Sequence, residues 1–109
     1  MSVVWRLDEA VEFVSRLAKK LRDVNYHVGI TGGVLHRGLS HNDLDIIIYP
    51  ASTAEMSQDD VEKILRRLGT RIYDRKHVRD TWAAQGSRDE KHVEVWEFGG
   101  KRVDIFFLA

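Results

Sequence analysis

The chain has 109 residues, of which 43% are hydrophobic and 31% are charged, and its 17 Lys and Arg residues balance 17 Asp and Glu residues. This length predicts one domain, 1–109, with a real core and no room for a second domain. The lack of cysteine excludes disulfides, thiolate zinc sites and cysteine nucleophiles, and the balanced charge disfavours a broadly basic nucleic-acid wrapper.

The first predicted element is an amphipathic helix near the N-terminus. Apolar residues recur every three or four positions from Leu7 to Val24, which places them in one stripe along a helix. Asp8 is a suitable N-cap residue for it.

A strand, a turn and a second strand follow in the sequence. Residues 28–31 are apolar and predict a short core strand, after which Gly32 and Gly33 predict a tight turn. A turn-rich loop then runs to Asn42. Residues 43–49 predict a second strand, which Pro50 ends because proline cannot continue a strand ladder.

A second helix is marked at both ends. Ser57 and Asp60 have the spacing of a capping box, and Gly69 has the position of a residue just beyond a helix end. The apolar stripe between them consists of Val61, Ile64, Leu65 and Leu68.

The remaining segments predict three more strands. Residues 70–73 form a short strand, and residues 92–98 and 102–108 form a hairpin joined by Gly99 and Gly100. Residues 74–91 have no clear period and predict a long loop, a kind of segment that is often functional. Together the elements predict an α+β domain, with a mixed sheet of about five strands and helices packed mainly on one face.

The strand over residues 43–49 carries the clearest chemical signal. Side chains alternate along a strand, so Asp43 and Asp45 share one face while the aliphatic residues between them face the core. Two carboxylates about 6.6 Å apart at the backbone, from a rise of about 3.3 Å per residue, can converge on one divalent cation or bridge two. The alternative is that both are solvent-facing residues at the start of an amphipathic strand.

Asp104 lies in the middle of the last predicted strand, where β-propensity disfavours aspartate. An aspartate at this position therefore indicates that its carboxylate interacts with another group. Beside Asp43 and Asp45 it would complete an oxygen-rich site suited to Mg²⁺ or Mn²⁺. The alternative is an ion pair with an Arg or Lys on a neighbouring strand.

Gly32 and Gly33 form the other notable feature. Paired glycines after a strand let other groups approach the backbone closely, and turn amides there can cradle a phosphate. On their own, they serve equally well to make a tight turn.

The combined pattern resembles the nucleotidyltransferase superfamily related to polymerase beta. Its hallmark is a Gly-Gly or Gly-Ser turn, then paired aspartates in a hydrophobic strand, then a third aspartate on a later strand. The resemblance assigns Gly32 and Gly33 to the phosphate-binding turn, the pair Asp43 and Asp45 to metal ligands, and Asp104 to the third carboxylate. Gly33 stands where many small members have serine, and Asp104 follows an extended insertion.

The resemblance implies a minimal nucleotidyltransferase domain. Its reaction would transfer a nucleoside monophosphate from a nucleoside triphosphate (NTP) to a hydroxyl acceptor on a protein, nucleic acid or small molecule. Mg²⁺ or Mn²⁺ would occupy a two-metal site on the three catalytic aspartates, and Asp104 could also help deprotonate the acceptor. Arg37 and Ser40, together with His36, could contact the triphosphate from the loop before Asp43, although each could equally be an ordinary loop residue.

A second hypothesis is non-enzymatic. The same fold could be a catalytically silent, antitoxin-like binding or regulatory module that acts with a partner chain, since no helical domain follows the last predicted strand. A protein partner or a homo-oligomer fits either hypothesis, whereas the net charge does not indicate a nucleic-acid partner. A generic α+β domain with coincidental aspartates is the third alternative.

The sequence also bears on location. No apolar run approaches the roughly 18 residues of a membrane span, and residues 1–8 lack the pattern of a secretory signal. We therefore expect a soluble cytoplasmic protein without a membrane partner.

Overall fold

The computed structural model describes residues 2–52, 58–73 and 92–107. In this part of the chain, a five-stranded mixed sheet has the order β2–β4–β7–β6–β5. Its strands are β2 (Tyr26–Thr31), β4 (Asp43–Pro50), β5 (Thr70–Tyr73), β6 (His92–Phe98) and β7 (Lys101–Phe107). β4 and β7 pair in parallel, and the other neighbours pair antiparallel.

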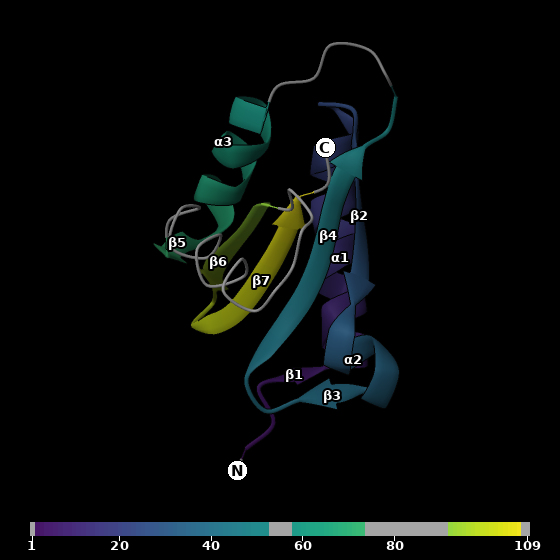
Figure 1. The fold of residues 1–109 in the computed structure, drawn as a ribbon, viewed down its shortest axis with the longest axis vertical. Helices are drawn as coiled ribbons and strands as arrows, with labels where there is room; N and C mark the ends of the chain where they lie inside the picture. The colour runs from purple at the N-terminus through teal and green to yellow at the C-terminus, as the bar shows by residue number, and fades with distance from the viewer. Residues whose placement is uncertain (1, 53–57, 74–91, 108–109) are drawn as a thin grey trace.

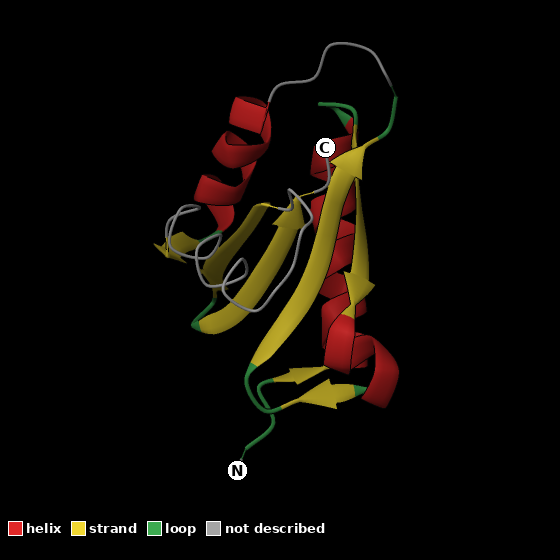
Figure 2. Cartoon of the chain, in the orientation of Figure 1, coloured by secondary structure: helices red, strands yellow, loops and turns green. Residues whose placement is uncertain are grey.

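Two helices pack against one face of this sheet. They are α1 (Leu7–Arg22), which lies behind β2 and β4 in Figure 1, and α3 (Gln58–Leu68), which lies beside β5 and β6. Both contribute to a single apolar core with the strands. The predicted α+β class and its helix-covered sheet face are therefore confirmed (Figure 2).

The first helix differs from its prediction at both ends. Arg6 holds the N-cap position instead of Asp8, because the chain enters α1 directly from the short strand β1 (Trp5–Arg6). The carboxylate of Glu9 accepts a hydrogen bond from the Arg6 N–H at 3.2 Å. The helix ends at Arg22 rather than Val24, and Asn25, with φ of 63°, turns the chain into β2.

The predicted turn and loop before residue 43 is the main error of the sequence analysis. Residues Gly32–Arg37 form a short helix, α2, and Leu39–Ser40 form the strand β3, which pairs with β1 in a separate two-stranded sheet. Val34 is fully buried and holds α2 against the core. Gly38, with φ of 83°, ends the helix with its N–H bonded to the Val34 carbonyl at 2.8 Å.

The later elements follow their predictions closely. The β6–β7 hairpin turns at Gly99 and Gly100, whose φ angles are 59° and 78°. The N–H of Gly69 bonds to the Leu65 carbonyl at 2.9 Å at the end of α3. The predicted cap residue Ser57, the predicted loop 74–91 and the last residue of the predicted strand 102–108 lie outside the described residues.

The two faces of β4 and β7 have opposite characters. The helix-covered face carries five fully buried aliphatic side chains, those of Leu44, Ile46, Ile48, Val103 and Ile105. Each such side chain contributes about 1.5–3 kcal/mol by leaving water. Strand alternation then directs Asp43, Asp45 and Asp104 to the other face. The core thus fixes the orientation of the acidic residues.

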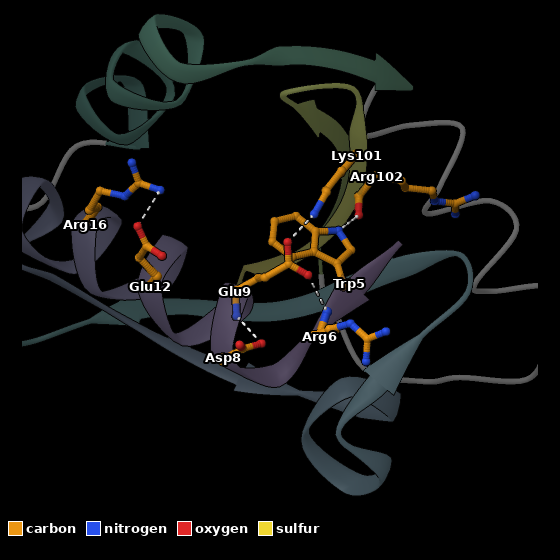
Figure 3. Close-up of polar contacts among 8 residues, drawn as sticks. All are labelled: Trp5, Arg6, Asp8, Glu9, Glu12, Arg16, Lys101 and Arg102. Carbon is orange, nitrogen blue, oxygen red and sulfur yellow. Dashed lines mark hydrogen bonds and ion pairs between the residues drawn. The ribbon is translucent and has the colours of Figure 1, made fainter. Parts of the chain in front are cut away.

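Trp5 fastens the N-terminal segment to the beginning of β7 (Figure 3). Its indole Nε1–H donates a hydrogen bond to the Arg102 carbonyl at 2.9 Å, across 97 positions of the sequence. The Lys101 ammonium lies 4.7 Å from the indole centroid and pairs with Glu9 at 2.9 Å. These contacts fix the backbone of β7 just before Asp104.

None of the described helices is both long enough and apolar enough to cross a bilayer.

Replacing Trp5 with phenylalanine should lower the free energy of unfolding by about 1 kcal/mol, the net value of one hydrogen bond. The phenyl ring keeps the aromatic contact with Phe13, whose centroid lies 5.6 Å from that of Trp5. Urea unfolding measures the difference. Lys101→Gln is the comparison, because it removes a partly exposed ion pair and should cost less. Wild-type stability in Trp5→Phe would contradict the role of this hydrogen bond.

Candidate functional site

The register of β4 against β7 brings the three predicted aspartates together. Asp45 lies opposite Asp104 in this parallel pair, and Asp43 lies opposite Arg102. Each aspartate offers one carboxylate oxygen, and the three oxygens lie within 4.8 Å of one another. The prediction that Asp104 meets Asp43 and Asp45 is therefore realised in the geometry, and we call these three residues the acidic cluster.

The acidic cluster is partly buried, which makes its negative charge costly. Burial is the main cause that raises the pKa of Asp43 to about 6, and a hydrogen bond with Asp104 and the charge of Asp45 add to it. Burial and the charge of Asp104 also raise the pKa of Asp45. The cluster therefore resists carrying three negative charges without a cation.

Arg102 supplies a positive charge at the edge of the cluster. Its Nε donates to Asp104 Oδ1 at 2.9 Å, and its Nη2 lies 3.4 Å from Oδ2. Asp104 thus lies beside Asp43 and Asp45 and also has a basic partner, but this partner comes from the same strand, two residues earlier, and not from a neighbouring strand. Arg102 was not among the site residues predicted from the sequence, although the Arg-x-Asp spacing places both side chains on one strand face.

Gly32 and Gly33 support Asp45 directly. The backbone N–H of Gly33 hydrogen-bonds to the Asp45 carboxylate and lowers its pKa, against the larger effect of burial. Gly32 has φ of 72°, and a Cβ at this position would overlap with that carboxylate. The close backbone approach expected of the glycine pair is therefore present, and the group that approaches is Asp45.

The other predicted nucleotide-binding residues lie on the segment between β2 and β4. Ser40 Oγ accepts hydrogen bonds from the N–H groups of Asn42 and Asp43, both at 3.1 Å, and so shapes the turn into β4. Arg37 is exposed at the end of α2, and its guanidinium reaches back to Gly33, where it would meet an added Cβ at 2.6 Å. His36 is exposed on the same helix.

Glu94 is a buried carboxylate that lies outside the acidic cluster. It is 1% exposed and accepts a hydrogen bond from the Trp96 indole N–H at 2.9 Å. Arg71 lies 3.9 Å from its other oxygen. Because Glu94 alternates in step with the core residue Trp96, it faces the helices, and its contacts give it a structural role.

Neither family models nor curated proteins give a match to this chain. Several solved structures are similar to it, and two of them are described here. Polymerase beta of Leishmania infantum, in a ternary P/T complex, superposes with a TM-score of 0.62 at 14% identity, over 98% of this chain and 43% of that chain. A cytoplasmic RNA terminal U-transferase has a TM-score of 0.58 at 15% identity, over 93% of this chain and 30% of that chain.

At these identities the similarity concerns the fold. It confirms the predicted α+β fold with a five-stranded mixed sheet, which this chain shares with polymerase beta and the terminal U-transferase. The chain spans less than half the length of each of these two proteins.

Replacing Asp43 with asparagine should stabilise the metal-free protein above pH 6. The pKa of Asp43 is about 6 in the folded protein, above its ordinary value of 3.8. The folded state therefore binds more protons between these values, and this carboxyl makes the wild type lose stability as the pH rises through that window. Urea unfolding in EDTA should show no difference near pH 4 and a gain of roughly 1 kcal/mol at pH 8, after allowance for solvent screening.

Glu12→Gln is the matched control for this comparison, because Glu12 is exposed and pairs only loosely with Arg16 at 3.6 Å. Its stability at pH 8 should stay close to that of the wild type, because an exposed ion pair contributes little. A loss of stability at pH 8 in Asp43→Asn would show that attraction to a positive charge outweighs the effects of burial and of the neighbouring carboxylates.

Gly32→Ala should destabilise the protein more than Gly38→Ala does. Both glycines have positive φ angles, but only at Gly32 would the new methyl group meet another side chain, that of Asp45. We expect a cost of about 1 kcal/mol at Gly38 and roughly 2–4 kcal/mol at Gly32, from unfavourable backbone conformation and overpacking. Thermal and urea unfolding measure both. Equal costs would mean that Asp45 moves aside freely.

Proposed function

We propose that the chain is a metal-dependent nucleotidyltransferase domain, which transfers a nucleoside monophosphate from an NTP to a hydroxyl group on a protein, nucleic acid or small molecule. The observation that carries the proposal is the convergence of Asp43, Asp45 and Asp104 within 4.8 Å on one sheet face. The similarity of the fold to a polymerase and a terminal U-transferase supports a nucleotide substrate.

The donor set of the acidic cluster fits a hard divalent cation. Carboxylate oxygens are the preferred ligands of Mg²⁺ and Mn²⁺, and burial together with the neighbouring carboxylates, which raise the pKa of Asp43 and of Asp45, would favour a bound cation. Asp43, Asp45 and Asp104 would hold the cations. When bound, such ions stabilise the charge that develops on phosphoryl, attacking and leaving oxygens.

In the proposed reaction the acceptor hydroxyl oxygen forms a bond to the α-phosphorus of the NTP. The bond from that phosphorus to the oxygen bridging the β-phosphate breaks, and pyrophosphate leaves with the electron pair. Asp104 is the proposed base for the hydroxyl proton, because it reaches the cluster from a different strand than Asp43 and Asp45. Arg37 and the backbone at Gly32 and Gly33 are proposed to lie against the triphosphate.

Recognition of the base and the acceptor is proposed to involve a further protein surface. The chain spans 43% and 30% of the two similar structures. A partner chain or a second copy of this chain would supply the additional contacts. We propose the cytoplasm as the site of action.

A catalytically silent binding module is the alternative function. The ion pair between Arg102 and Asp104 favours it, because it neutralises the proposed base. Incubation of the protein with NTPs labelled at the α-phosphate and with candidate acceptors separates the two functions. Sustained transfer of label to an acceptor excludes a purely regulatory role.

The double substitution Asp43→Asn with Asp45→Asn should weaken metal-dependent nucleotide binding strongly. Calorimetric titration of a non-hydrolysable NTP in Mn²⁺ should show at least about a tenfold weaker affinity, since each lost charged contact is worth about 1.5–3 kcal/mol. The matched control is Glu12→Gln with Asp23→Asn, two exposed carboxylates on and after α1. Equal affinity in the wild type and the acidic-cluster variant would refute the proposed site.

A further inference from the structure

Arg102 lies against the acidic cluster without being able to bind a metal ion, since a guanidinium has only donors. It sits opposite Asp43 in the strand register and two residues before Asp104 on β7. Its side chain contacts both carboxylate oxygens of Asp104, at 2.9 and 3.4 Å. A cation bound by Asp104 would therefore meet a positive charge already in place.

We propose that Arg102 is a displaceable counter-cation, which neutralises Asp104 in the metal-free protein and moves to the triphosphate when metal and nucleotide bind together. This inference rests on the proposed function. It assigns to Arg102 the coupling between the two ligands, a role distinct from holding either the metal or the acceptor.

The backbone and the side chain of Arg102 are held by different contacts. Its carbonyl accepts the hydrogen bond from the Trp5 indole at 2.9 Å, which anchors the backbone. Its side chain is 47% exposed, whereas that of Asp104 is 15% exposed. In Figure 3 the side chain of Arg102 runs away from Trp5, on the opposite side from the anchored carbonyl. The guanidinium can thus change partner while the strand stays in place.

The positive charge of Arg102 affects how a metal ion and a nucleotide would bind at the acidic cluster. Arg102 lies opposite Asp43 in the strand register and pairs with Asp104, so its positive charge lies next to two members of the acidic cluster. A divalent cation arriving alone has to displace this charge and is repelled by it. A triphosphate brings oxygens that a guanidinium binds through paired donors. Metal and triphosphate therefore assist each other's binding, and the assistance is reciprocal.

The test is the affinity for Mn²⁺, with and without a non-hydrolysable NTP, in the wild type and in Arg102→Gln. Titration at pH 8 keeps protons from competing for Asp43. Without nucleotide, Arg102→Gln should bind Mn²⁺ about tenfold more tightly than the wild type, the equivalent of losing one charge-assisted contact that the metal has to break. The gain in Mn²⁺ affinity on adding the NTP should fall by a similar factor.

Two further variants complete the design. Arg16→Gln, on the exposed face of α1, should bind Mn²⁺ as the wild type does. Arg102→Lys keeps the charge but loses the two-pronged contact, so it should lie between the wild type and Arg102→Gln. It also provides a folded variant if removal of the charge prevents folding.

Mn²⁺ affinity in a folded Arg102→Gln that equals or falls below the wild-type value would overturn the role of Arg102. The same holds for an unchanged effect of NTP on Mn²⁺ binding. If Mn²⁺ binds the wild type but not the Asp43→Asn, Asp45→Asn variant, the metal centre stands whatever Arg102 does. Failure of the wild type to bind Mn²⁺ overturns the proposed function and the role of Arg102 together.

Discussion

The parallel pairing of β4 with β7 is the constraint on which the rest of the site depends. It places Asp45 opposite Asp104 and so completes the acidic cluster. A shift of one residue would turn the aspartates into the core and the aliphatic residues toward solvent. The buried side chains of Leu44, Ile46 and Ile105 therefore enforce the register that the site requires. Packing on the helix-covered face determines the chemistry of the opposite face.

The contrast between the two faces of β4 and β7 explains how the protein tolerates repulsion within the acidic cluster. Three carboxylates within 4.8 Å repel one another, and they do so on a partly buried surface. Apolar burial on the other face of the same strands supplies the opposing free energy. Local contacts reduce the remaining strain, because Gly33 donates to Asp45 and Arg102 pairs with Asp104. Apolar packing thus holds together three carboxylates that would otherwise move apart.

The sequence predicts the helices and strands in which apolar and polar residues repeat with a short period. The alternation through residues 43–49 indicates the face of Asp43 and Asp45, and the stripe beginning at Leu7 predicts α1. The sequence does not encode strand pairing between distant segments in any local pattern, so the predicted position of Asp104 depends on its disfavoured place in a strand and on a family resemblance. The short helix α2 escaped prediction because glycines began and ended it, and glycine is typical of turns. Arg102 was not predicted because its position opposite Asp43 depends on the pairing of β4 with β7.

The order of the strands along the chain has a consequence for the protein during its synthesis. β4 leaves the ribosome well before β7, so a growing chain carries Asp43 and Asp45 for some time without Asp104. Pairings between distant segments form late, because the intervening chain has to close a long loop first. A nascent or truncated fragment thus has two carboxylates and an incomplete ligand set. The acidic cluster forms only when β7 pairs with β4, so this late pairing is a precondition of any chemistry at this site.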